Sequence, residues 1–286
     1  MKRIKPASLI LAAAAMIAFT ACDRNAGKTD GDSGILPQGI TMMTIDSVNL
    51  TSFRDNAEER RMPNSLFYGK NDSDSINILS PEGSVPSSIS CFLIEKKGKK
   101  MLFDTGKGPD KGGRLLALLD SMDIKPTDID YVMITHFHGD HIGGMLDGDK
   151  VVFPNAEVYA SKKEYEAWMN MPPEKNRQAV KTMKAYKERL HLFEFGDTLP
   201  GNIIAMDAAG HTPGHTAFLA GKALIAGDIM HGVALQLVRP DVCPTYDMDK
   251  DAAIASRKRI LSYAKKNGLL LCGMHFPAPA FLKLDK

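Results

Sequence analysis

The sequence contains few cysteines, almost no excess charge of either sign and no basic stretch with interleaved aromatics. Its four cysteines are widely spaced and form no Cys-x-x-Cys pair, which excludes a zinc knuckle and a dithiol redox motif. The formal net charge of +2 suggests no polyanionic partner, so nucleic-acid binding is not predicted. The 44% hydrophobic and 24% charged residues are typical of a globular protein with a substantial core. Cys91 and Cys272 lie in apolar, strand-like stretches, so buried free thiols are expected and no disulfide is predicted.

The chain also lacks, near its start, an apolar run long enough for a comfortable membrane span. Residues 1–21 combine basic side chains with a short apolar stretch ending at Phe19, which is typical of an export signal peptide. The end of this stretch resembles a bacterial lipobox, which implies a lipidated Cys22; ordinary signal-peptidase cleavage near Ala21 is the alternative. Residues 22–38 are rich in Gly, Asp and Ser and are predicted to form a flexible tether. We therefore expect export and lipid anchoring to a bacterial membrane, on its periplasmic side or at the cell surface.

Residues 39–286 are predicted to form the functional domain, in which strands and helices are mixed without strict alternation. Apolar strand-like runs include 130–134 and a hairpin that turns at 97–99. Helical spacing is found over 112–122, 162–169, 174–191 and 247–268, and the last of these helices ends at Gly268. This mixture favours two sheets packed face to face with helices outside.

Residues 135–144 read THFHGDHIGG and concentrate three of the eight histidines within six positions. This loop directly follows the strand expected at 130–134, and its glycines allow it to fold tightly. It contains the candidate ligands His136, His138, Asp140 and His141. Imidazole and carboxylate groups are ordinary ligands of a borderline metal such as zinc. A polar surface loop that is rich in histidine by chance is the alternative.

Three more candidate ligands stand where later strands are expected to end. They are His211 in GHTPGH, Asp228 in ALIAGD and His275 in GMHFP. A charged aspartate after an apolar run is costly unless something pairs with it, and a metal is the simplest partner. Because one tetrahedral site does not easily use four side chains of one short loop, two adjacent metals are favoured. A single histidine at the end of a strand or helix is more often a structural residue than a metal ligand. We interpret His191, at the end of the predicted helix, as such a structural residue.

The motifs THFHGDH, GHTPGH, AGD and GMH resemble those of the metallo-β-lactamase superfamily, from about residue 40 to near the C-terminus. The resemblance implies an α+β fold, a four-layer αββα sandwich, with two Zn²⁺ ions at one edge. The first metal would be held by His136, His138 and His211. The second would be held by Asp140, His141 and His275, with Asp228 bridging both. Asp104 in LFDTG would support the ligands, although a plain turn residue is the alternative.

Within the superfamily, GDIMHGVALQ and GMHFPAP look most like the branch of methyl parathion hydrolase and the N-acyl homoserine lactone lactonases. The bridging Asp228 argues against the dizinc β-lactamases, which generally lack it. The small lactonases have a tyrosine three residues after this aspartate, where this chain has His231. The resemblance thus implies hydrolysis of lactone, ester or phosphotriester bonds by a metal-bridging hydroxide, with N-acyl homoserine lactones (quorum quenching) as the substrate hypothesis.

Further roles follow from this hypothesis. Asp140 would also pass a proton to the leaving group, and His231 would contact either the substrate oxygen or Asp228. The substrate pocket is expected to include Phe137, Met230 and Trp168, although core packing accounts for Trp168 equally well. A β-lactam hydrolase and an inactive metal-binding lipoprotein remain as alternatives. The expected partner is a small ester or lactone, with membrane contact only through the lipid anchor; a homodimer stays open.

Overall fold

The computed structural model describes residues 37–46, 48–69 and 74–285. The predicted signal peptide, the predicted lipidation site Cys22 and nearly all of the predicted tether lie outside these residues. No helix within the described ranges combines the length and the apolar character needed to cross a membrane.

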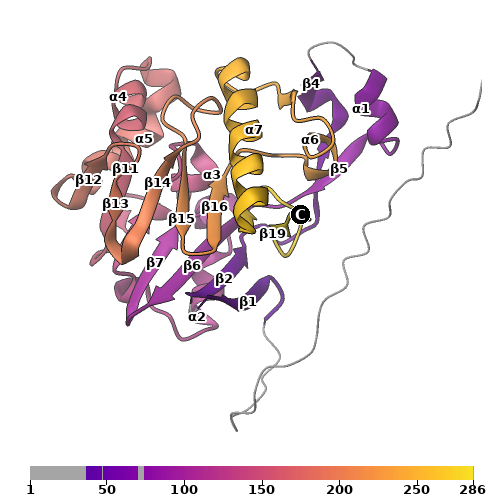
Figure 1. Cartoon of the computed structure of the whole chain (residues 1–286). Coiled ribbons are helices and arrows are strands. Elements are labelled where there is room, and N and C mark those ends of the chain that lie inside the picture. Colours follow the sequence, from indigo (N-terminus) through magenta and orange to yellow (C-terminus); the bar gives the residue numbers. More distant parts are fainter. Residues whose placement is uncertain (1–36, 47, 70–73, 286) are drawn as a thin grey trace, which may run out of the picture. The chain divides into compact units, whose positions relative to one another are not determined.

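A seven-stranded mixed sheet forms one half of the fold (Figure 1). Its strands, in spatial order, are β1 (Ile40–Ile45), β2 (Val48–Arg54), β6 (Ser90–Lys96), β7 (Lys99–Phe103), β8 (Tyr131–Met133), β11 (Glu157–Ser161) and β12 (Leu190–Phe193). The pairs β1–β2, β2–β6 and β6–β7 are antiparallel, whereas the pairs β7–β8, β8–β11 and β11–β12 are parallel. The C-terminal ends of parallel strands meet at one edge of a sheet. The loops that follow β7 and β8 are therefore neighbours.

A six-stranded sheet forms the other half. Its strands are, in spatial order, β13 (Thr198–Leu199), β14 (Ile203–Asp207), β15 (Thr216–Ala220), β16 (Ala223–Gly227), β18 (Leu270–Gly273) and β19 (Phe281–Lys283). All neighbours are antiparallel except β16 and β18, which run parallel. Asp228 and His275, which follow these two strands, are thereby brought to the same edge.

The layer between the sheets is filled by large apolar side chains from both. Phe103 of β7 packs on Phe218 of β15 with ring centroids 5.5 Å apart. Phe92 of β6 packs on Phe281 of β19 at 5.9 Å. Each such aromatic pair contributes about 0.5–1.5 kcal/mol beyond the burial of its area, and together they hold the sheets face to face.

Helices cover the outer faces of both sheets. α7 (Lys250–Asn267) lies beside β16 in the view of Figure 1 and buries Ile260 and Ala264 in the core cluster that includes residues of the second sheet. α2 (Leu115–Asp120), α4 (Lys162–Met169) and α5 (Pro173–Ala185) contribute to a separate core cluster on the outer face of the first sheet. The predicted α+β fold, a four-layer αββα sandwich, is thus confirmed.

Short elements complete the chain. β3 (Arg60–Pro63) pairs with β5 (Ser84–Ser87), and β4 (Phe67–Gly69) pairs with β17 (Val242–Pro244). With α1 (Asp74–Leu79) and α6 (Val233–Gln236) they enclose a third apolar cluster, which includes Met62, Phe67, Val85 and Leu235. We call these elements the flanking layer. α3 (Gly139–Ile142) is followed by the hairpin of β9 (Leu146–Asp147) and β10 (Lys150–Val151).

The helix predicted at 174–191 is wrong in its second half. α5 ends at Ala185, and His191 lies in β12, where its ring stacks on Tyr159. The chain leaves the helix at Tyr186, whose φ of −100° and ψ of 8° are not helical and whose buried hydroxyl donates to the Met145 carbonyl oxygen at 2.9 Å. The helix at 162–169 and the left-handed Gly268 after α7 are confirmed, while the helix predicted at 112–122 is shortened to α2.

The described cysteines are all buried free thiols. This confirms the prediction for Cys91 and Cys272, and Cys243 behaves in the same way.

Candidate metal centre

The histidine loop begins where β8 ends and is fixed there by a buried carboxylate. Thr135 donates to Asp104 from its backbone N–H at 2.8 Å and from its hydroxyl at 2.7 Å. After the histidines the chain passes so close to residues 105–107 that only glycine fits. A Cβ atom at Gly143 would lie 2.2 Å from the Lys107 carbonyl oxygen, and one at Gly144 would lie 2.1 Å from that of Thr105.

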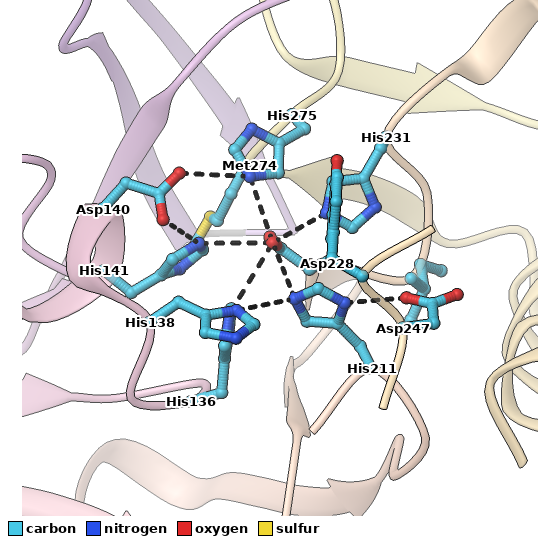
Figure 2. A network of polar contacts seen from close by, with 12 residues as sticks. His136, His138, Asp140, His141, His211, Asp228, His231, Asp247, Met274 and His275 are labelled. Carbon is cyan, nitrogen blue, oxygen red and sulfur yellow. Dashed lines mark hydrogen bonds and ion pairs between the residues drawn. The ribbon is translucent and has the colours of Figure 1, made fainter. Parts of the chain in front are cut away.

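Three histidines form the first candidate ligand group (Figure 2). His138 Nδ1 lies 2.9 Å from His136 Nε2 and 2.9 Å from His211 Nε2. The far nitrogen of His211, Nδ1, faces Asp247 Oδ1 at 2.8 Å. Because this contact occupies Nδ1 as the donor, the lone pair of His211 Nε2 is directed at the other two imidazoles.

Asp140, His141 and His275 form the second group (Figure 2). Asp140 Oδ2 lies 3.5 Å from His275 Nε2, and its Oδ1 lies 3.8 Å from His141 Nε2. His141 Nδ1 donates to Asp104 Oδ2 at 2.6 Å, and His275 Nδ1 donates to the Ser88 carbonyl oxygen at 2.8 Å. Both imidazoles therefore present Nε2 to the centre with a fixed orientation.

Asp228 stands between the two groups. Its Oδ2 lies 3.4 Å from His211 Nε2, 3.3 Å from His141 Nε2 and 3.0 Å from His275 Nε2. The Asp228 backbone N–H donates to His215 Nε2 at 2.9 Å, while His215 Nδ1 donates to the Ala208 carbonyl oxygen. His215 is thus a structural residue that holds the aspartate in place.

These side chains suit a divalent metal. Among the described residues, the buried atoms His141 Nε2 and Asp228 Oδ1 have no hydrogen-bond partner. Buried polar atoms without partners are rare and call for an unseen partner such as an ion. Imidazole nitrogens facing one another at 2.9 Å, with carboxylate oxygens beside them, are a donor set typical of zinc.

The electrostatics of the centre also favour a cation. Burial lowers the pKa of His136 and His211 well below the usual value for histidine, so both are neutral and keep a lone pair for a metal. Burial opposes the charge of Asp228, but its histidine neighbours, His141 first, hold the pKa of this carboxyl well below its usual range. A buried anion stays at the centre and needs a positive partner.

Two carboxylates that support the ligands, those of Asp247 and Glu164, were not predicted from the sequence. Asp247, besides contacting His211, forms an ion pair with the buried Arg257 at 3.5 Å. Glu164 accepts from the backbone N–H groups of Phe137 at 3.0 Å and Gly214 at 2.7 Å, and so joins the two loops that carry the first histidine group. The contact of Glu164 with the two loops is not evident from the sequence, because SKKE at 161–164 has the pattern of an ordinary helix cap.

The expected pocket residues need correction. Phe137 is 2% exposed and Met230 is 0% exposed, and each belongs to an apolar core cluster. Phe137 lies between two ligands that face the centre, so its own side chain points the other way, into the core under α4. Trp168 is 6% exposed and meets the His138 ring edge-on at 5.5 Å. It therefore supports a ligand and is buried rather than open to substrate.

His231 lies within the centre. Its Nε2 is 3.0 Å from Asp228 Oδ2, and its backbone N–H donates to Gln236 Oε1 at 2.7 Å. Its Nδ1 is buried without a hydrogen-bond partner among the described residues. The position next to Asp228 matches one of the two roles expected from the sequence.

The fold and the site define a class of protein: an αββα sandwich with a histidine- and aspartate-rich metal centre where parallel strands end. The family model of the metallo-beta-lactamase superfamily matches residues 85–275. The chain belongs to this superfamily, which includes metal-dependent hydrolases.

Solved structures share this fold over most of the chain. The hydrolase AbOPH of the beta lactamase superfamily is 26% identical, with a TM-score of 0.78 over 87% of this chain and 94% of that one. AidC, a dizinc quorum-quenching lactonase solved with the product N-hexanoyl-L-homoserine, is 25% identical, with a TM-score of 0.75 over 87% and 97%.

Curated relatives match over shorter segments. The uncharacterized protein YobT of Bacillus subtilis is 27% identical over 49% of this chain and 61% of its own length. Exodeoxyribonuclease WalJ of Streptococcus pneumoniae is 32% identical over 43% and 41%. Hydroxyacylglutathione hydrolase 2 of Vibrio vulnificus is 28% identical over 40% and 42%. The chain thus spans between two fifths and about three fifths of these relatives.

Proposed function

We propose that this protein is a dinuclear zinc hydrolase of lactone or ester bonds, with N-acyl homoserine lactones as candidate substrates. The observation that carries the proposal is the position of Asp228, whose Oδ2 lies 3.4 Å from a histidine of the first group and 3.0 Å from one of the second. A single carboxylate oxygen shared by two ligand groups suits two adjacent metals. The likeness to AidC, a dizinc lactonase, supports the same assignment.

The residues of the centre would have different roles in such a reaction. Two bound zinc ions would supply an activated water at neutral pH and polarise the substrate oxygen. Asp140 is the most accessible carboxylate of the centre, with a side chain 31% exposed against 2% for Asp228. It is therefore placed to take up a proton and deliver it to the leaving alkoxide. Asp104 and Asp247 keep His141 and His211 in the orientation that binding requires.

A substrate panel tests the proposal. Zinc-loaded protein is assayed against N-acyl homoserine lactones, aryl esters, paraoxon and nitrocefin. We expect the highest kcat/KM on a lactone or an aryl ester. A dominant rate on nitrocefin would instead assign a β-lactam hydrolase, and no turnover on any substrate at full zinc occupancy would indicate a metal-binding protein without activity.

Replacing His231 by alanine separates its two expected roles. Because His231 Nε2 lies 3.0 Å from Asp228 Oδ2, we expect the substitution to weaken zinc affinity by about 10- to 100-fold. Excess zinc should then restore the rate. A turnover loss of about 10²- to 10³-fold that persists at full metal occupancy would instead assign His231 to the substrate oxygen in the transition state.

We also propose that a lipid on Cys22 anchors the exported protein to a membrane. The lipobox-like sequence that ends at Cys22 supports this. Cell fractionation tests it, since Cys22→Ala should move the protein into the soluble fraction, and an unchanged distribution would contradict the anchor.

A further inference from the structure

The flanking layer brings an arginine to the metal centre from a distant part of the chain. Arg60 and Met62 are two residues apart on β3, so their side chains lie on the same face of that strand. The Tyr246 hydroxyl contacts Met62 Sδ at 3.9 Å. The Tyr246 ring meets His231 and His211 edge-on, with centroids 5.1 Å and 6.0 Å apart. The face of β3 that carries Arg60 is therefore the face turned toward the metal centre.

A second set of contacts leads from Arg60 to the other ligand group. Arg60 Nη1 donates to Ser87 Oγ at 2.8 Å, and Ser87 Oγ donates to the His275 carbonyl oxygen at 3.1 Å. Burial raises the pKa of Tyr246, with Asp228 adding to this rise, and the nearby Arg60 guanidinium opposes it. Arg60 thus lies close enough to Tyr246 to affect its pKa, and Ser87 links it to the backbone of the ligand His275.

Among the described residues, no carboxylate forms an ion pair with the Arg60 guanidinium. Within this part of the chain, its one hydrogen bond to a side chain goes to the Ser87 hydroxyl. It is half-buried and lines a cavity of about 230 Å³ with Arg54, Arg61 and Glu59, next to Pro277. Arg61 is already paired with Glu82 at 2.6 Å. A half-buried cation with free donors is a ready site for an anion, which a guanidinium binds with directional hydrogen bonds.

We propose that Arg60 determines substrate specificity by binding an anionic group, a carboxylate in particular, of the ester or lactone whose acyl carbon lies at the metals. This rests on the proposed function. The flanking layer would then select substrates that carry a carboxylate at the end of the acyl chain away from the scissile bond.

Binding of simple dicarboxylates tests this without requiring turnover. Calorimetry on zinc-loaded protein compares each dicarboxylate from succinate to suberate with the monocarboxylate of equal chain length, since one carboxylate of each can occupy the metals. We expect the best-fitting dicarboxylate to bind about 10- to 100-fold more tightly than its matched monocarboxylate, the gain of one charge-assisted contact. In Arg60→Gln this preference should fall to about twofold or less.

Arg61→Gln is the matched control, because Arg61 lines the same cavity but its guanidinium is already paired with Glu82. It should keep the preference of the unaltered protein. Dicarboxylate preference that persists in Arg60→Gln, or that is absent from the unaltered protein, would overturn the inference. Mono-4-nitrophenyl adipate and 4-nitrophenyl hexanoate then report the same preference as kcat/KM. If neither ester nor any lactone is hydrolysed, the proposed function fails while the binding series still decides the role of Arg60.

Discussion

Replacing Asp228 by alanine is expected to lower the rate of ester or lactone hydrolysis by about 10³-fold or more. The carboxylate is the one group shared by both ligand sets, with its Oδ2 3.3 Å from His141 Nε2 and 3.4 Å from His211 Nε2. Losing a metal removes several kcal/mol of transition-state stabilisation, and each ~1.4 kcal/mol is about tenfold in rate. Metal analysis of the variant should show fewer than two ions per chain. Excess zinc should not restore the rate, because the shared ligand itself is missing.

The matched control is Asp149→Ala, since the Asp149 side chain is 94% exposed and lies in a surface ion pair with Lys181. This control should keep the full rate and metal content. An Asp228→Ala variant that is folded and keeps more than about a tenth of the rate would show that Asp228 does not join two metals.

Glu164→Ala is expected to lower the free energy of unfolding by about 3 kcal/mol or more. Two backbone N–H groups, of Phe137 and Gly214, would each lose a hydrogen bond to a buried acidic group, and hydrogen bonds to charged groups contribute about 1.5–3 kcal/mol each. Urea denaturation of the metal-free protein measures this loss apart from any contribution of bound zinc.

Glu166→Ala, on the exposed side of the same helix, provides the comparison and should change stability by no more than about 0.5 kcal/mol. The Glu164 variant should also bind zinc more weakly, because the glutamate joins the loop of His136 and His138 to the loop of His211. A Glu164→Ala protein as stable as the control would mean that these loops hold their positions without the buried carboxylate.

The candidate metal ligands can be predicted from the sequence because they occupy similar positions in it. Each stands just after an apolar strand, and parallel strands such as β7 and β8, or β16 and β18, bring their C-terminal ends to one edge. The structure places all seven candidate ligands there, with Asp104 behind His141. Spacing and residue type alone were enough to select them.

Long-range contacts account for what the sequence does not predict. Asp247 reaches His211 from the loop before α7, and Glu164 joins two loops that are far apart in the chain. Nothing local marks either residue. Likewise, the side chain of Phe137 was assigned to the pocket because it lies between two ligands, although alternation along the loop sends it into the core. The position of Arg60 near the centre is the hardest to predict from the sequence, because it depends on how the whole flanking layer packs.

The dinuclear centre is tested by a zinc titration of the metal-free protein, with bound metal and hydrolytic rate followed together on the best substrate of the panel. We expect the metal content to rise to two zinc ions per chain and the rate to reach its plateau only when both are bound, since seven ligands exceed what one tetrahedral ion uses. A plateau in both metal content and rate at one ion per chain would contradict the dinuclear centre.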